Sequence, residues 1–230
     1  MQKTSIGIII YLLIPVVLFA GDGASFVNLG FSDDSSYFMF GQYGLSSKSI
    51  QPYAELSIVD VAKNSFVSQG SFSEKYSEEA SAGINAIGTL FRLALKNAAT
   101  IANYKINPAR NGRLLYVLLD GQKPLPSLEF RDFINGNLYN LTLIQQQKKT
   151  GSTVSACFTI NLTLTSKDGK RTSAVVGKAD YYRPGVTDYR IKYIILAPDA
   201  KSLVFVIEKT MPTDTGADIR YMVETIKLPL

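Results

Sequence analysis

Residues 157–182 read CFTINLTLTSKDGKRTSAVVGKADYY, and this stretch decides the fold class. Its first half alternates with a period of two, which is typical of a β-strand with one buried face. The apolar positions of that half are Phe158, Ile160, Leu162 and Leu164, and the polar ones are Thr159, Asn161, Thr163 and Thr165. Lys167–Asp168–Gly169–Lys170 follows, and Asp-Gly suits the positive φ angles of a tight hairpin turn. We therefore expect Thr172–Tyr182 to return as the antiparallel partner strand.

Stretches of strand length lie on both sides of this hairpin. Phe26–Phe31 and Tyr37–Phe40 flank the turn signal Ser32–Ser36, which predicts another hairpin. Ala54–Val61 then alternates, with Leu56 and Ile58 on one face. The remaining strands that we expect are Leu114–Leu119, Leu138–Ile144, Tyr189–Leu196, Ser202–Glu208 and Ile219–Leu228. The last three are expected to form an antiparallel meander.

Residues 77–104 interrupt the strands with a helical pattern. Apolar residues recur there at alternating spacings of four and three, namely Ala80, Ile84, Ile87, Phe91, Ala94, Ala98 and Ile101. Ser77 suits the N-cap, Glu78 and Glu79 place negative charge on the first turn, and Asn107–Pro108 stops the helix. The alanines of the stripe favour docking on a sheet, and a coiled coil is the alternative.

These patterns together predict a mainly β fold with one long α-helix, an α+β arrangement. Its antiparallel sheets are expected to be sandwich-like or propeller-blade-like, without forming a complete propeller. The expected domains are a signal peptide at 1–20 and a single secreted β-rich domain at 21–230, with the helix at about 77–104.

Two segments share a weak internal similarity. Phe31–Phe40 (FSDDSSYFMF) aligns with Leu196–Phe205 (LAPDAKSLVF). Continuing without a gap sets Leu56 and Ile58 against Tyr221 and Val223. Each segment resembles a TolB-like propeller repeat, in which an apolar strand leads into a Ser-Pro-Asp-Gly turn and then to a strand ending near "VDV", as at residues 59–61. A propeller needs at least about four blades, and only two candidates are found.

Residues 1–20 read MQKTSIGIIIYLLIPVVLFA and have the character of a secretion signal. Lys3 supplies a positive start, and an apolar run of about 15 residues follows, whereas a membrane-spanning helix needs about 20. Small residues after the run could serve a signal peptidase at more than one position. An uncleaved N-terminal anchor is the alternative. No cysteine near the end of the run could accept a lipid.

As a whole, the order of parts resembles a bacterial family of predicted secreted proteins, domain of unknown function 2259. The resemblance is carried by residues 29–44 (LGFSDDSSYFMFGQYG), 52–67 (PYAELSIVDVAKNSFV) and 197–209 (APDAKSLVFVIEK), and by the helix. It implies export and supplies no activity, so there are no family catalytic residues to carry over.

The composition excludes several kinds of chemistry. The chain contains no histidine, which removes Ser-His-Asp and Cys-His catalysis and histidine-based zinc sites. The single cysteine, Cys157, can form no disulfide within the chain and has no histidine to activate it. It lies on the polar face of its strand, yet we expect an inert, packed thiol. The net charge is +5, but the basic residues form no continuous stripe, which argues against nucleic-acid binding.

Two pairs of neighbouring carboxylates, Asp33 with Asp34 and Glu78 with Glu79, are the candidates for glycosidase or divalent-metal chemistry. Sequence neighbours rarely converge on one substrate, so we interpret the first pair as turn residues and the second as a helix start. One further group could form an aromatic and basic surface of the kind that stacks on sugars or bases: Tyr181, Tyr182, Arg183, Tyr189, Arg190 and Tyr193.

The sequence therefore predicts an exported, periplasmic or secreted, non-enzymatic binding protein of the bacterial cell envelope. We expect its partner to be an envelope protein or a glycan, held by loops such as Gly41–Gln51 or Lys209–Ala217. No catalytic residue, cofactor, metal or nucleic acid is expected, and no stable membrane insertion once the signal is cleaved. A carboxylate-based hydrolase and a purely structural envelope component are the alternatives.

Overall fold

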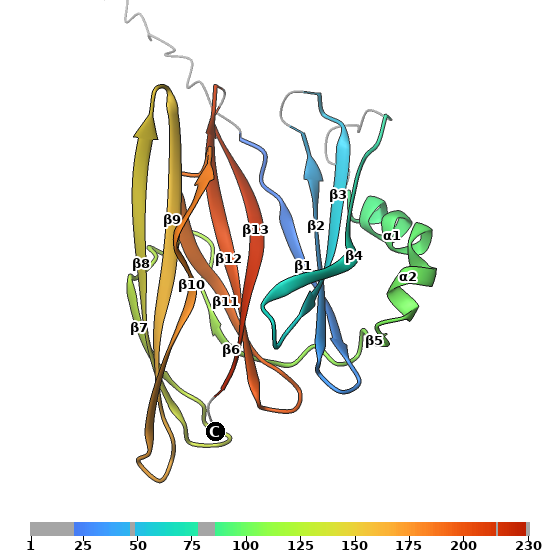
Figure 1. The fold of residues 1–230 in the computed structure, drawn as a ribbon. Coiled ribbons are helices and arrows are strands. Elements are labelled where there is room, and N and C mark those ends of the chain that lie inside the picture. The colour runs from blue at the N-terminus through green and yellow to red at the C-terminus, as the bar shows by residue number, and fades with distance from the viewer. Residues whose placement is uncertain (1–20, 47–48, 78–85, 215, 229–230) are drawn as a thin grey trace, which may run out of the picture.

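The chain folds into three antiparallel sheets that lie face to face, with helices covering one outer face (Figure 1). The computed structural model describes residues 21–46, 49–77, 86–214 and 216–228. The expected signal peptide lies outside the described residues. None of the described helices is long and apolar enough to cross a membrane.

The helix-side sheet has the strand order β4-β3-β2-β1-β5. Its strands are β1 (Ser25–Ser32), β2 (Tyr37–Leu45), β3 (Pro52–Asp60), β4 (Ser65–Lys75) and β5 (Ile106–Asn107). The central sheet has the order β13-β12-β11-β6, with β6 (Arg113–Val117), β11 (Asp188–Leu196), β12 (Ser202–Thr213) and β13 (Gly216–Lys227). The long-strand sheet has the order β10-β9-β8-β7, with β7 (Ser127–Arg131), β8 (Leu138–Thr150), β9 (Thr153–Thr165) and β10 (Arg171–Pro184).

The central sheet is buried on both faces, and β12 illustrates why. Leu203, Phe205 and Ile207 belong to the hydrophobic core shared with the long-strand sheet. Val204 and Val206 point the other way, into the core shared with the helix-side sheet. A strand covered on both sides needs a continuous apolar run rather than alternation, and residues 203–207 supply one.

The predicted strands and hairpins are confirmed. The Asp-Gly turn joins β9 to β10 in register, with Thr165 opposite Arg171, and Gly169 has a φ of +87°. β1 pairs with β2, and β11, β12 and β13 form the expected meander. Mainly β architecture with antiparallel sheets is therefore correct.

The prediction of one long helix is wrong. The described residues contain two short ones, α1 (Ile87–Lys96) and α2 (Ala98–Ala102), and residues as far as Lys75 belong to β4. Asn97 separates the helices: its φ of −109° is not helical, and its side-chain amide donates to the carbonyl oxygen of Leu93 at 2.8 Å. An asparagine side chain that bonds to the main chain in this way competes with helical hydrogen bonds.

The predicted apolar stripe of the helices was correct at Ala94 and Ile101, which pack on the helix-side core, but not at its centre. Leu90 and Leu93 are the buried residues of α1 and pack on Met39 and Ile58 of the helix-side sheet, whereas Phe91 is 53% exposed. Both candidate stripes have spacings of three and four, so the spacing alone could not choose between them. Ser77 lies outside both helices, and Ala80, Ile84, Glu78 and Glu79 lie outside the described residues.

Candidate functional site

Two adjoining clefts form a groove where β4, β10 and β13 meet, each the edge strand of a different sheet. Each cleft has a volume of about 490 Å³, and the two share Glu55 and Ser73. We call them together the edge groove. One half is lined with aromatic and basic residues, including Phe66, Phe72, Tyr181, Arg183, Lys209 and Tyr221. The other half is richer in charge, with Asp22, Tyr53, Glu74, Asp218 and Arg220.

An irregularity in β10 brings Tyr181 and Arg183 to the groove. Lys178 pairs with Phe158 and Arg183 pairs with Ala156, so residues 179–182 lie opposite Cys157 alone. Extra residues in one strand bend it and redirect its side chains. The guanidinium of Arg183 lies 4.8 Å from the ring centre of Tyr181, which is a cation–π contact.

Arg183 retains hydrogen-bonding capacity that the protein does not use. Its Nη2 lies 3.5 Å from Oε1 of Glu224, a long ion pair. Its Nη1 is buried and has no hydrogen-bond partner within the described part of the chain. A buried donor without a partner carries a desolvation cost of about 1–3 kcal/mol.

Lys209 is a second cation of the groove, and unlike Arg183 it has no partner within the described part of the chain. It lies in β12 directly opposite Arg220 of β13, and the described residues offer its ammonium no hydrogen bond or ion pair. Burial lowers the pKa of this ammonium, the nearby carboxylate of Glu55 partly counteracts the effect, and Arg183 adds to it. The folded protein thus holds a partly desolvated positive charge at the groove.

Gln42 fixes the floor of the groove by joining two sheets. Its Nε2 donates to Oε2 of Glu55 at 2.7 Å and to the carbonyl oxygen of Tyr221 at 3.2 Å. Its Oε1 accepts from the Tyr221 amide at 2.8 Å. The helix-side sheet is therefore tied to the outer edge of the central sheet through one buried amide.

Replacing Gln42 by leucine should lower the free energy of unfolding by about 2 kcal/mol, because both main-chain groups of Tyr221 lose a buried partner. Urea denaturation measures the change. Gln146→Leu, on the exposed part of β8, is the matched control and should stay within about 0.5 kcal/mol of the parent. Equal effects of the two substitutions would show that the hydrogen bonds of Gln42 between the two sheets contribute nothing to the free energy of unfolding.

The charged half of the groove is organised around Arg220. Its Nη2 lies 2.6 Å from Oδ2 of Asp22, and its guanidinium stacks 4.5 Å from the ring centre of Tyr53. The Tyr53 hydroxyl donates to Oδ1 of Asp22 at 3.1 Å. Burial raises the pKa of Asp22 despite the attraction of Arg220, and burial raises the pKa of Tyr53 as well.

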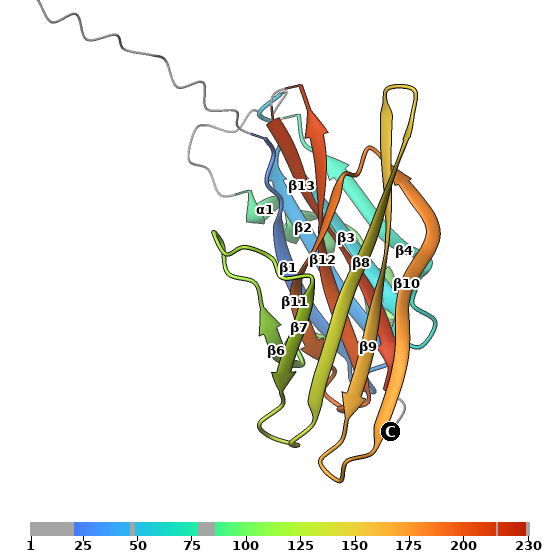
Figure 2. The same ribbon diagram turned by 90° about the vertical axis from the view of Figure 1, so that its left-hand side faces the viewer.

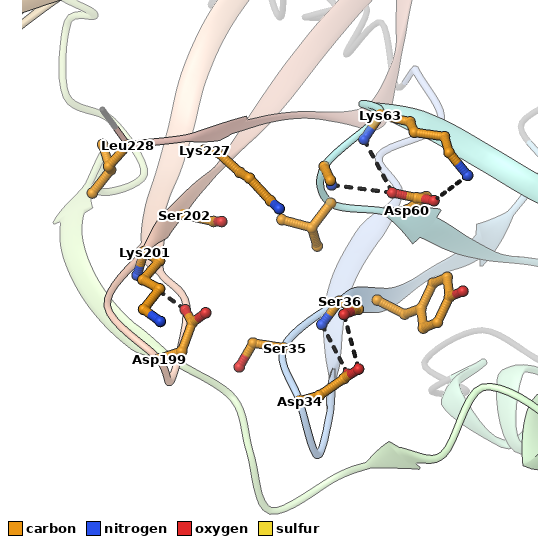
Figure 3. A pocket seen from close by; sticks show the side chains of 13 residues that line it. Asp34, Ser35, Ser36, Asp60, Lys63, Asp199, Lys201, Ser202, Lys227 and Leu228 are labelled. Atoms are coloured by element: carbon orange, nitrogen blue, oxygen red, sulfur yellow. Dashed lines mark hydrogen bonds and ion pairs between the residues drawn. The ribbon is translucent and has the colours of Figure 1, made fainter. Parts of the chain in front are cut away.

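A third cleft, of about 690 Å³, lies between the turns at Asp34 and Asp199 (Figure 3). Asp34 accepts from the Ser36 amide at 3.0 Å, and Asp199 accepts from the Lys201 amide at the same distance. Hydrogen bonds from Ser32 and Ser36 lower the pKa of Asp34 to about 2. Asp60, in the same cleft, accepts amides of its own turn and pairs with Lys63 at 2.9 Å. These carboxylates are occupied within their turns, so the edge groove is the stronger candidate site.

The Asp34 and Asp199 turns explain the internal similarity. The residue after each aspartate has a positive φ, 62° at Ser35 and 58° at Ala200, and each donates its amide three residues back. The third strands of the two segments, β3 and β13, match only with a shift of two residues. Ile58 lies opposite Met39, and the residue opposite the equivalent Val204 is Thr225 rather than Val223. The ungapped continuation was therefore wrong there. The likeness to TolB repeats stays a prediction.

The candidate residues from the sequence have mixed outcomes. Asp33 accepts from Asn107 at 3.1 Å while Asp34 belongs to its turn, so this pair does not converge on a common site. Glu78 and Glu79 lie outside the described residues. Cys157 is 1% exposed, and its thiol donates to the carbonyl oxygen of Ala179. The expected packed thiol is confirmed, and the displaced segment of β10 is what covers it.

The predicted aromatic and basic surface forms only in part. Tyr181 and Arg183 meet at the groove, whereas Tyr189 is buried and donates to the carbonyl oxygen of Ala156. Tyr182 donates instead to Gln146 on β8. The remaining two lie elsewhere: Arg190 pairs with Asp188 and Tyr193 packs on Phe26.

Of the two predicted binding loops, Lys209–Ala217 is largely strand and Gly41–Gln51 is strand in its first five residues. Gly41–Leu45 belongs to β2 and Lys209–Thr213 to β12, while residues 47–48 and 215 lie outside the described part. Lys209 nevertheless reaches the groove, from a strand position rather than a loop. Sequence reasoning missed Gln42, Glu55 and Arg220; the signal was a polar residue within an otherwise apolar strand.

A family model described as predicted secreted protein (DUF2259) matches residues 39–227 of this chain. The match includes every described strand except β1 and the start of β2, and all the groove residues except Asp22. Neither the curated proteins nor the solved structures contain a match.

Proposed function

The chain belongs to the DUF2259 family of predicted secreted proteins, and we propose that it is a non-enzymatic binding protein of the bacterial cell envelope. The ligand that fits the edge groove best is an anionic glycan. Family membership supports export, and the predicted signal peptide agrees with it. The periplasm is the compartment that we propose.

The observation that carries this proposal is the unpaired, partly desolvated ammonium of Lys209, which lines the groove together with the positively charged Arg183. Holding such groups away from water costs stability that an apolar residue would not cost. A carboxylate or phosphate of a ligand would form a charge-assisted hydrogen bond with the ammonium of Lys209, and the positive charge of Arg183 would add to the attraction.

Aromatic side chains extend the argument from an anion to a sugar. Phe66 of β4 and Tyr181 of β10 are each 57% exposed, and they line the groove from two different sheets. Exposed aromatic rings offer flat apolar surfaces on which the faces of sugar rings can stack. The second cleft lengthens the site, which suits a polymer better than a single sugar.

A carboxylate-based hydrolase is the second candidate, because the charged half of the groove contains both Asp22 and Glu55. The raised pKa of Asp22 is a property of general acids. However, Asp22 is bound by Arg220 and Tyr53, and Glu55 accepts from Gln42. These partners make a positioning role in binding the better interpretation.

Isothermal titration calorimetry with tetragalacturonate, and with maltotetraose as the uncharged counterpart, tests the proposal. We expect saturable binding of the uronate only. Lys209→Met should weaken it at least tenfold, as loss of a charge-assisted hydrogen bond of about 1.5–3 kcal/mol requires. Lys149→Met removes the same charge from an exposed position of β8 and should leave the affinity unchanged.

Three outcomes would contradict the proposal. These are equal affinity for both oligosaccharides, equal effects of the two lysine substitutions, and shortened products in the titration cell, which would favour the hydrolase. Thermal denaturation separates misfolding from lost binding. Because the pKa of Lys209 is lowered in the folded state, the charge opposes folding at pH 7, so Lys209→Met should keep or raise the melting temperature.

A further inference from the structure

The turn that joins β7 to β8 lies at one end of the long-strand sheet (Figure 2). Two of its apolar side chains are exposed to solvent. Phe133 is 92% exposed and Ile134 is 77% exposed. We call these two residues the apolar tip. Adjacent large apolar side chains that are mostly exposed lower solubility, and they mark interaction sites when the backbone holds them in place.

The backbone of this turn is held firmly. Asp132 is buried and receives both terminal nitrogens of Arg113, with Nη2 to Oδ2 at 2.7 Å. It also accepts the Ile134 amide at 3.0 Å, and its own carbonyl oxygen accepts the Gly136 amide at 2.7 Å. The tip is therefore displayed by a built turn rather than by a loose loop.

Basic residues lie at the same end of the sheet as the tip. Arg131 lies opposite Leu138, Leu138 opposite Thr165, and Thr165 opposite Arg171, so these residues form one row across the sheet. The β9–β10 turn consequently lies at the same end as the tip, as Figure 2 shows. It adds Lys167 and Lys170, both exposed.

Few acidic groups offset this charge. Asp168 lies in the β9–β10 turn and accepts from Ser166, and Glu129 lies further along β7. Asp132 is already neutralised by Arg113. This end of the sheet thus combines the apolar tip with a net positive charge. We call its basic residues, Arg131, Lys167, Lys170 and Arg171, the basic rim.

We propose that this end of the molecule docks on an anionic phospholipid surface, with Phe133 and Ile134 entering the interface and the basic rim contacting the headgroups. The rim supplies the charge complementarity, since each basic residue near such a surface adds about 1 kcal/mol, a factor of about five in binding. A second copy of this chain is a poorer occupant, because a stable interface buries about 800 Å² per partner and two side chains on a protruding turn cannot provide that. This contact is separate from the edge groove and does not depend on its ligand.

Co-sedimentation of the mature chain with vesicles tests the proposal. We expect binding to vesicles of about three parts phosphatidylcholine to one part phosphatidylglycerol, and at least tenfold weaker binding to phosphatidylcholine alone. The double variant Phe133→Ser with Ile134→Ser should also bind at least tenfold more weakly. Lys170→Gln should weaken binding about fivefold. Val175→Ser, which removes a 64% exposed side chain from β10, is the matched control and should bind as the parent does.

Binding that survives the double substitution, or that ignores lipid charge, would overturn the proposal. So would a dimer in size-exclusion chromatography that the double substitution dissociates, because the tip would then serve self-association. Far-ultraviolet circular dichroism checks that each variant keeps its sheets. Since the replaced side chains are exposed, unfolding is not expected to confuse the result.

Discussion

Replacing Arg113 by methionine should lower the free energy of unfolding by about 3 kcal/mol, because it leaves a buried carboxylate without its cation. The side chain of Asp132 is fully buried, and Arg113 supplies both of its charged contacts. The remaining amide of Ile134 offsets only part of the loss. Urea denaturation at pH 7 measures the change.

The pH dependence identifies the cause. The hydrogen bond from Arg113 lowers the pKa of Asp132 below its unfolded value of 3.8, so this pair stabilises the fold above about pH 4 and ceases to do so as the pH falls through the lowered value. In the variant, protonation of Asp132 relieves the unpaired charge. The deficit of Arg113→Met should therefore shrink between pH 7 and pH 4.

Arg171→Met is the matched control, because it removes the same side chain from an exposed position at the start of β10. Its effect should stay within about 0.5 kcal/mol at both pH values. A deficit of Arg113→Met that is equally large at pH 7 and pH 4 would mean that lost packing, and not the charge of Asp132, is responsible.

Local patterns in the sequence were sufficient for most of the described strands, but they did not predict β4, β5 or β7. Alternation in residues 158–165 and the Asp-Gly turn at 168–169 determine the β9–β10 hairpin without reference to the rest of the chain. The stacking of three sheets is different. It depends on which strand faces which, and the signals for strands covered on both sides were the continuous apolar runs at 193–197 and 203–207.

The prediction of the helix was wrong for a related reason. Its capping signals and spacing are local, but the choice between the stripe with Phe91 and the stripe with Leu90 depends on the sheet beneath. Met39 and Ile58 accommodate Leu90 and Leu93, and Gly41 leaves room for Leu90, because a β-carbon at Gly41 would lie 2.6 Å from a Leu90 methyl carbon. No pattern within 77–104 contains that information.

The groove could be predicted only in fragments. Tyr181 and Arg183 were found because they are neighbours in sequence, whereas the pairs that organise the site lie far apart. Asp22 and Arg220 are 198 positions apart, and Gln42 and Tyr221 are 179 apart. Such contacts arise when the two meanders pack on each other, so no motif spacing encodes them.

The two proposals make independent demands on the molecule. The groove needs charges that are poorly solvated, whereas the apolar tip needs apolar groups that are fully solvated. Both cost free energy in the isolated chain, and a ligand or a lipid surface would recover that cost. The central sheet must therefore contribute enough free energy of unfolding to offset both costs. A substitution in its strand β12 measures that contribution.

Truncating Phe205 to alanine should lower the free energy of unfolding by about 4 kcal/mol, the largest effect of a single substitution that we expect. Phe205 is fully buried in β12, between Ile194 of β11 and Glu224 of β13, and its ring faces the long-strand sheet. Neighbouring strands on both sides prevent the sheet from collapsing into the space left behind, so the lost transfer free energy and the cavity both count. Urea denaturation followed by tyrosine fluorescence measures the change.

Phe91→Ala is the matched control, because it removes the same atoms from an exposed position on α1 and should cost less than about 1 kcal/mol. If Phe205 lies at the centre of one cooperative core, its truncation should destabilise the helix-side sheet and the long-strand sheet together, giving one transition by circular dichroism and by fluorescence. Two separate transitions, with only the long-strand sheet weakened, would mean that β12 does not couple the two cores. Because Val204 and Val206 of the same strand pack on the helix-side sheet, we expect the single transition.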